Sequence, residues 1–306
     1  MFEFEWPREK ADFKFIDKES NCIIKNINNE NLSKEFYKYS INFNLAGNTV
    51  IDYLIPLRNN AVKDSWFFPM VYLYRQSLEL ILKALVFKYI INKQEGIKYL
   101  REVGHNLSSS FDVVYRNIQF NSTNTGEKEL LWLKEYLNDI TYMDRESDVF
   151  RYPFSNNGIS FLKEQKNINL VYLKTNMITA YQIIKDIYEE VDTTTKQYSA
   201  YKPIFLINGG DYIEQSVIGW HMSLDNFDFY PYIKGYTETA NYLRNLISKD
   251  IIKCSGMFLP MCYLYRNSVE LSLKRILIKD INLDYKKAMR KISRKKHSVS
   301  GIWNDI

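Results

Sequence analysis

The chain has 306 residues, 46% of them hydrophobic and 25% charged, which is enough for two ordinary domains with apolar cores. Its 41 basic and 36 acidic side chains give a net charge of +5, a surplus that permits a nucleic-acid partner without requiring one. The sequence contains no run of eighteen apolar residues, which excludes a transmembrane helix, and its start lacks a signal-peptide core. We therefore expect a cytoplasmic protein.

Cysteine and histidine usage predicts no disulfide framework, no metal site and no cofactor. The three cysteines, Cys22, Cys254 and Cys262, form no Cys-x-x-Cys pair. The three histidines are scattered along the chain. The sequence also has no phosphate-binding loop, no H-E-x-x-H motif and no dinucleotide-binding glycine fingerprint.

Residues 1–30 are mixed, and the alternating stretches FEFEW and DFKFI allow one or two short strands or an irregular arm. A helix is then predicted to start at Asn31 or Ser33, either of which can cap it, and to reach Leu54 before Pro56. Gly47 is a point at which this helix could break.

The next part of the chain is dominated by segments of helical periodicity, separated by Gly- and Asn-containing clusters. The predicted helices span residues 63–91, 97–103, 107–118, 127–142 and 170–191. Residues 144–158, which contain FRYPFSNNG, are expected to be irregular. Residues 204–232 permit no firm assignment, although a few short strands are allowed there.

One long helix occurs twice. Residues 67–85 read FFPMVYLYRQSLELILKAL and residues 258–276 read FLPMCYLYRNSVELSLKRI, with twelve of nineteen positions identical. Such a repeat predicts a repeated structural unit. The preceding residues 239–243 match residues 50–54 in pattern, and KHSVSGIWNDI after the second helix matches GHNLSSSFDVV after the first.

The repeat divides the chain into an arm (1–30), a helical unit (31–198), a connector (199–232) and a second unit (233–306). The second unit lacks a counterpart of the FRYP segment and of the closing helix, so we expect a truncated unit or a fragment. Its repeated helix would then keep an apolar face to bury. We expect this face to pack on the equivalent helix of the first unit or on a second copy of the protein.

Both copies of the helix carry a charged stripe. Arg75, Glu79 and Lys83 follow one another at intervals of four residues and therefore share one helix face. The second copy repeats them as Arg266, Glu270 and Lys274. The stripe can be a paired structural feature of a core helix, or Arg75 and Glu79 can line a polar seam with a chemical task.

His105 and His297 follow the stripe lysines by 22 and 23 residues, and each stands just before a predicted helix start. At such a place a histidine can cap the helix or donate to a neighbouring carbonyl. It can equally act as a general base near neutral pH.

Arg151 lies in the aromatic segment 150–153, where an arginine can bind a phosphate through two hydrogen bonds. It can also hold the loop in place by pairing with a helix end or with Glu79. Asp144 and Asp148, just before it, are further candidate partners.

Residues 286–297 contain eight basic or potentially basic side chains within twelve positions, Arg290 and His297 among them. These side chains could contact nucleic-acid phosphates. Because no aromatic residues are interleaved with them, a solvated helix face is the simpler interpretation.

Three segments together resemble a group of bacterial helical proteins related to the HEPN superfamily: LYRQSLELILKALV, GHNLSSSF and SDVFRYPFSNNG. The resemblance covers about residues 65–160 and part of 258–306. It implies an all-α fold of tandem HEPN-like bundles. It also implies a metal-independent ribonuclease or RNA-binding protein of bacterial defence or toxin type, whose cleavage a chelator would not affect.

The HEPN signature places an arginine a short spacer before a histidine. Arg290 precedes His297 with six residues between them, whereas the first copy has Lys98 at that position. The resemblance implies that His105 and His297 take a proton from the ribose 2′-hydroxyl. The residues implied to stabilise the phosphate or complete the site are Arg75, Arg151, Arg266, Arg290 and Glu79.

HEPN sites often form where two domains meet, so pairing of the two units would bring His105 and His297 toward a common groove. The implied partners are RNA, a second copy of the protein or an antitoxin-like protein, and no membrane. The alternative function is a non-catalytic helical binding module, in which the charged stripe and the FRYP segment serve structure or partner recognition.

Overall fold

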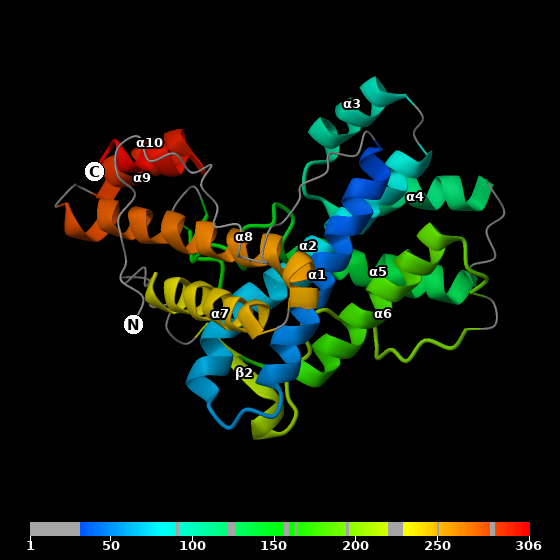
Figure 1. The fold of residues 1–306 in the computed structure, drawn as a ribbon, viewed down its shortest axis with the longest axis horizontal. Coiled ribbons are helices and arrows are strands. Elements are labelled where there is room, and N and C mark those ends of the chain that lie inside the picture. Colours follow the sequence, from blue (N-terminus) through cyan, green and yellow to red (C-terminus); the bar gives the residue numbers. More distant parts are fainter. Residues whose placement is uncertain are drawn as a thin grey trace.

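The computed structural model describes residues 31–89, 92–120, 126–155, 159–162, 164–193, 196–219, 229–249, 251–281 and 285–306 (Figure 1). Helices dominate these residues, and their one sheet has two strands, so the predicted all-α class is confirmed. The helices are α1 (Leu32–Leu54), α2 (Asn60–Tyr89), α3 (Lys93–Val103), α4 (Leu107–Phe120), α5 (Glu127–Met143), α6 (Leu170–Glu189), α7 (Tyr230–Lys249), α8 (Ile251–Arg275), α9 (Tyr285–Lys295) and α10 (Val299–Trp303).

Helix α1 begins and ends where the sequence predicts. The Asn31 side chain accepts a hydrogen bond from the backbone N–H of Lys34, which satisfies a donor that the first turn leaves free. The possible break at Gly47 is wrong, because the helix continues through it. A Cβ atom at Gly47 would lie 3.2 Å from the Tyr74 ring, so this glycine instead lets α1 approach α2 closely.

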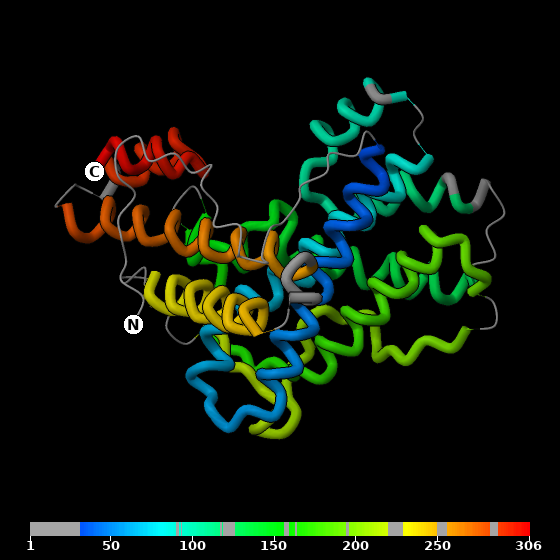
Figure 2. The backbone as a smooth tube through the Cα atoms, viewed as in Figure 1, coloured from blue at the N-terminus to red at the C-terminus, as the bar shows by residue number. Residues whose placement is uncertain are grey.

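Two helix pairs form the centre of the molecule, α1 with α2 and α7 with α8. They also pack crosswise, since α2 contacts α7 and α1 contacts α8. Figure 2 shows the tube of α8 running from the left edge of the molecule to its middle, where it meets α1. The predicted contact of α8 with its equivalent, α2, is present where Tyr263 stacks on Tyr72, but most of α8 is covered by α7 and α1.

The crosswise packing is reciprocal. A Cβ atom at Gly235 of α7 would lie 2.0 Å from the Ser65 carbonyl oxygen of α2. Ser65 and Gly256 occupy the same position in the two copies of the repeated helix, and Gly256 in turn faces Asn42 and Leu45 of α1. The two units are therefore related by an internal approximate two-fold axis, as in a symmetric dimer.

Hydrogen bonds correct the alignment of the helices that precede the repeat. The Tyr74 hydroxyl donates to Asn48 Oδ1 at 2.5 Å, and the equivalent Tyr265 hydroxyl donates to Asn241 Oδ1 at 2.6 Å. Asn241 therefore corresponds to Asn48, four residues away from the pairing of 239–243 with 50–54. One helical turn separates the two alignments, so both place apolar residues on the same face.

The strands are β1 (Lys166–Asn169) and β2 (Gln215–Ile218), which pair antiparallel. Strand β2 lies in the region where strands were allowed, but β1 lies outside it. The sequence of β1, KNIN, has one apolar residue, Ile168, so no alternating pattern predicts this strand. The last residue of β1, Asn169, also connects the strand to the next helix. Its side chain accepts hydrogen bonds from the backbone N–H groups of Val171 and Tyr172 and so caps α6.

The second unit ends in a π-helical segment and two short helices. Helix α8 continues into one π-helical segment, Ile276–Asp280, and α9 packs on this segment while α10 packs on α8 and α9. No helix among the described residues is long and apolar enough to cross a membrane. The predicted arm at residues 1–30 and the third histidine, His221, lie outside the described residues.

Candidate functional site

The charged stripe of α2 forms a cluster with His105, which we call the first quartet: Arg75, Glu79, Lys83 and His105. Glu79 is its centre. The Arg75 Nη1 donates to Glu79 Oε2 at 2.9 Å, and the Lys83 ammonium donates to Oε1 at 2.6 Å. His105 Nδ1 lies 2.9 and 3.1 Å from the two carboxylate oxygens.

Arg75 is fully buried, so its donors must be satisfied inside the protein. Its Nη2 donates to the backbone carbonyls of His105, at 2.7 Å, and Asp144, at 3.1 Å. Its Nε lies 3.0 Å from Asp144 Oδ2. Arg75 is thus fixed by the turn before α4 and by the end of α5, and its donors point at protein groups.

Glu79 is a carboxylate kept charged inside the protein. Burial alone would raise its pKa, but the hydrogen bond with His105 and the charges of Arg75 and Lys83 outweigh burial. The pKa of Glu79 is therefore held well below its ordinary value. A buried carboxylate with three such partners is stable only as long as the partners remain.

The second copy builds the same cluster, the second quartet: Arg266, Glu270, Lys274 and His297. Arg266 Nη1 donates to Glu270 Oε2 at 3.2 Å, Lys274 lies 2.8 Å from Oε1, and His297 Nδ1 lies 3.0 Å from Oε1. Arg266 Nη2 donates to the His297 carbonyl at 2.8 Å, as Arg75 does to the His105 carbonyl. The hydrogen bond with His297 and the charge of Lys274 hold the pKa of Glu270 at about 2 against the effect of burial.

The two quartets differ in exposure. The Arg75 side chain is fully buried, whereas 44% of the Arg266 side chain is exposed. The two histidines are alike, with 46% of the His105 and 42% of the His297 side chain exposed. The second quartet therefore offers solvent both a cation and an imidazole, while the first offers mainly the imidazole.

The FRYP segment of the first unit docks on the second quartet. The Tyr152 hydroxyl donates to Glu270 Oε1 at 2.9 Å and lies 2.8 Å from His297 Nδ1. The Tyr152 and His297 rings are stacked, with centroids 5.5 Å apart. The Lys274 ammonium lies 4.1 Å from the centre of the Tyr152 ring, a cation–π contact.

Arg151 holds this segment in place, but through partners that the sequence did not indicate. Its Nη2 donates to the Tyr152 hydroxyl at 2.7 Å, and its guanidinium lies 5.7 and 5.8 Å from the ring centres of Tyr72 and Tyr263. The expected pairing with Glu79 is wrong, because Arg75, Lys83 and His105 occupy that carboxylate. The expected pairing with Asp144 is also wrong, because Asp144 serves Arg75.

The segment from Asp144 to Tyr152 physically connects the two quartets. Asp144 contacts Arg75 at one end, and its Oδ1 accepts from the backbone N–H groups of Asp148 and Val149. The other end carries Tyr152, which contacts Glu270 and His297. The irregular segment thus bridges the two quartets, and both of its ends contact buried charged groups.

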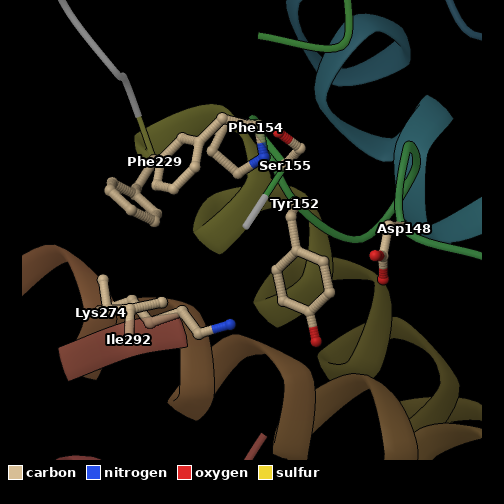
Figure 3. A pocket seen from close by; sticks show the side chains of 8 residues that line it. Asp148, Tyr152, Phe154, Ser155, Phe229, Lys274 and Ile292 are labelled. Carbon is tan, nitrogen blue, oxygen red and sulfur yellow. The ribbon is translucent and has the colours of Figure 1, made fainter. Parts of the chain in front are cut away.

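A small pocket lies beside the second quartet (Figure 3). Asp148, Tyr152, Phe154, Phe229, Lys274 and Ile292 line most of it. Figure 3 shows the Lys274 ammonium reaching toward the Tyr152 ring, with Phe154 and Phe229 together on one side. Burial lowers the pKa of Lys274 and raises the pKa of Asp148, so burial disfavours the charged form of both groups.

The histidine geometry suits proton transfer. In each quartet Nδ1 faces a carboxylate, so a neutral imidazole carries its proton on Nδ1 and keeps an unprotonated Nε2. In the second quartet Nδ1 is also within hydrogen-bond distance of the Tyr152 hydroxyl. An oriented imidazole of this kind is the arrangement of a general base.

The chain does not bring His105 and His297 together. His105 lies between α3 and α4, and His297 lies between α9 and α10; Figure 1 places these two helix pairs on opposite sides of the molecule. The predicted common groove is therefore wrong for the single chain, because α1, α2 and α8 lie between them. Arg290 is exposed on α9 and is not part of either quartet.

Sequence reasoning missed three members of the site. Lys274 and Lys83 were visible as the ends of the stripe but were not assigned a role. Tyr152 was visible only as part of the FRYP sequence, and its contact with His297 spans 145 residues. Among the described residues no group of three His, Cys, Asp or Glu side chains could hold a metal ion.

Comparison with known proteins gives no relatives: no protein-family model, no curated protein and no solved structure matches this chain.

Proposed function

We propose that this chain cleaves RNA without a metal ion, and that the second quartet is the reacting site. The observation that carries the proposal is the Glu270–His297 pair, whose imidazole is oriented, half exposed and adjacent to the half-exposed Arg266. The HEPN resemblance of the repeated helix and of the FRYP segment points to the same chemistry. It also extends the proposal to a bacterial defence or toxin role with an antitoxin-like partner or a second copy.

The proposed reaction is an internal transfer at phosphorus. The His297 Nε2 takes the proton of a ribose 2′-hydroxyl while the 2′-oxygen attacks the adjacent phosphorus. The bond from phosphorus to the 5′-oxygen breaks, this oxygen takes a proton from water, and a 2′,3′-cyclic phosphate remains. The His297 imidazolium then returns its proton to the solvent. Glu270 stabilises the imidazolium that forms, and Arg266 stabilises the charge that develops on the phosphate oxygens.

The first quartet is proposed to be structural. All the Arg75 contacts described above are with protein groups, and burial keeps its guanidinium from a substrate phosphate. Because Arg75 is buried, His105 lacks the half-exposed stripe arginine that His297 has in Arg266. The two quartets would therefore share one architecture, with a structural role for the first and a catalytic role for the second.

The test is cleavage of labelled single-stranded RNA and tRNA by purified protein and by matched variants. His297→Ala should abolish cleavage, and His105→Ala, the same change at the equivalent position, should retain most of it. Loss of cleavage in both variants would assign the reaction to both quartets. Full activity in His297→Ala would refute the proposal.

The alternative is a non-catalytic helical binding module. It is favoured by one observation: both carboxylate oxygens in each quartet already have internal partners, as expected of a device that fixes loops to helices. Wild-type protein that binds RNA or a protein partner but leaves every RNA intact would establish this alternative.

A further inference from the structure

The positive charge of the chain is concentrated at one end of the fold. Residues 285–306 contain seven lysines and arginines and one acidic residue, Asp305. Since the whole chain has 41 basic and 36 acidic side chains, the other residues carry 34 basic and 35 acidic ones and are almost neutral. The net charge of the protein therefore belongs to α9, α10 and the turn between them.

Helix α9 presents this charge on one side. Its apolar residues Ala288, Met289 and Ile292 are buried, and the helix packs on the π-helical segment that ends α8. Lys287, Arg290 and Arg294 are exposed, and their spacing of three and four residues places them on one face. We call these three residues the α9 cationic face.

Asp305 neutralises little of this charge but brings an aromatic residue to it. Its carboxylate lies 3.7 to 3.9 Å from Lys291, Arg294 and Lys295, yet 71% of the Arg294 side chain remains exposed. Trp303 is 63% exposed and stands two residues before Asp305, so its Cα is within about 7 Å of the Asp305 Cα. The exposed Trp303 is therefore carried by a segment that Asp305 connects to the end of α9.

The cationic surface also runs into the second quartet. His297 follows Lys296 at the end of α9, and its carbonyl accepts from Arg266 at 2.8 Å. Cations thus extend from Arg290 and Arg294 through the turn to Arg266, beside the half-exposed imidazole.

We propose that the α9 cationic face and Trp303 form a docking surface for a single strand of nucleic acid. Regularly spaced cations match a phosphate backbone, and an exposed indole can stack on an unpaired base. A membrane surface fits less well, because an amphipathic membrane helix inserts its apolar face and α9 has buried that face in the protein. That the bound strand is RNA and is cleaved rests on the proposed function. Binding of a single strand to this surface does not depend on the proposed function.

Binding is measured separately from cleavage by fluorescence anisotropy with a 2′-O-methyl oligonucleotide, which has no 2′-hydroxyl to react. The triple variant Lys287→Gln/Arg290→Gln/Arg294→Gln should weaken binding about 100-fold at 0.1 M salt and reduce the salt slope by about 2. Trp303→Ala should weaken binding about tenfold at all salt concentrations. The matched control, Arg101→Gln/Lys128→Gln/Arg145→Gln, removes three exposed charges from the first unit and should bind as the wild type does.

Three outcomes would overturn the docking surface: equal loss in the control triple variant, duplex RNA bound as tightly as the single strand, or anionic phospholipid vesicles bound more tightly than the oligonucleotide. Single-stranded DNA should bind like the 2′-O-methyl strand, since both offer phosphates and bases. If the predicted losses of binding appear but no RNA is cleaved, the docking surface stands and the proposed function fails. If RNA is cleaved and the triple variant has an unchanged KM, the docking surface fails and the proposed function stands.

Discussion

Tyr72 and Tyr263 stack on each other with ring centroids 5.0 Å apart and ring planes 15° apart. They occupy the same position in the two copies of the repeated helix, so two equivalent residues contact each other at the internal two-fold axis. Arg151 lies over both rings. The second unit is therefore part of one core with the first unit, and disturbing this contact zone should destabilise the whole chain.

The close approach of α7 to α2 gives a direct test of this packing. Gly235→Ala would place a methyl group 2.0 Å from the Ser65 backbone oxygen, which cannot move aside without shifting α2. We expect a loss of about 2 kcal/mol or more in the free energy of unfolding, as in an overpacked core. Urea denaturation monitored by circular dichroism measures it.

Gly256→Ala is the matched control, since it replaces a glycine at the reciprocal contact. Here the new methyl group would lie 3.2 Å from the flexible end of Leu45, which can move. The helix propensity of alanine favours this change by about 1 kcal/mol. We expect stability within about 1 kcal/mol of the wild type. Similar losses in both variants would contradict the distinction between a backbone and a side-chain obstacle.

The buried carboxylates predict sensitivity to acid. The pKa of Glu270 is about 2 in the folded chain and 4.5 ordinarily, and the pKa of Glu79 is also lowered. A lowered folded pKa stabilises the protein above pH 4.5, and this stabilisation is lost as the pH falls from 4.5 to about 2. Glu270 alone should contribute about 3 kcal/mol. Urea midpoints measured between pH 6 and pH 3 should fall steeply, and a flat profile would contradict these pKa values.

Neutralising the two carboxylates separately should show that the quartets differ. Glu79→Gln leaves the fully buried Arg75 without its main counter-charge, so we expect a loss of about 3–5 kcal/mol in stability. Glu270→Gln leaves Arg266 and His297, both half exposed, which water can solvate. It also leaves the buried Lys274, but burial lowers the pKa of this lysine, so it can lose its charge. We therefore expect a smaller loss than for Glu79→Gln. A larger loss for Glu270→Gln, measured by chemical denaturation, would contradict the structural role assigned to the first quartet.

The helices and the charged stripes could be predicted from the sequence because their information is local. Asn31 caps a helix through its own next residues, and the stripe at 75, 79 and 83 follows from helical periodicity. Because the repeated helix has the same sequence pattern, the helix and its charged stripe could also be predicted for the second unit. The retained spacing from the stripe to each histidine was the signal that His105 and His297 belong to the same kind of site.

The relation between the units could not be predicted, because it depends on contacts between distant residues. Tyr152 lies 118 residues from Glu270, and nothing in its neighbourhood specifies which quartet it serves. Strand β1 exists because a distant strand pairs with it, not because of its own composition. The common groove within the single chain was wrong for the same reason: the repeat indicates that His105 and His297 are equivalent, and equivalence across a two-fold axis does not imply proximity.

Tyr152→Phe tests whether the FRYP segment positions His297. The change keeps the ring and its stacking but removes a hydroxyl that contacts Arg151, Glu270 and His297 at 2.7 to 2.9 Å. The Arg151 Nη2 donor would then lose its partner inside the protein. We expect a loss of about 1–3 kcal/mol in stability. If the proposed function is right, kcat for RNA cleavage should fall about tenfold with little change in KM, because binding groups are intact and the imidazole is less firmly oriented.

Tyr136→Phe is the control for this change. The Tyr136 hydroxyl is also buried, but it has no hydrogen-bond partner within the described part of the chain. Removing it should leave stability unchanged or slightly increased, because a buried polar group without a partner is unfavourable. Equal effects of the two variants on unfolding would show that loss of any buried tyrosine hydroxyl is costly. A Tyr152→Phe protein with wild-type stability and wild-type kcat would show that the contact with His297 positions nothing.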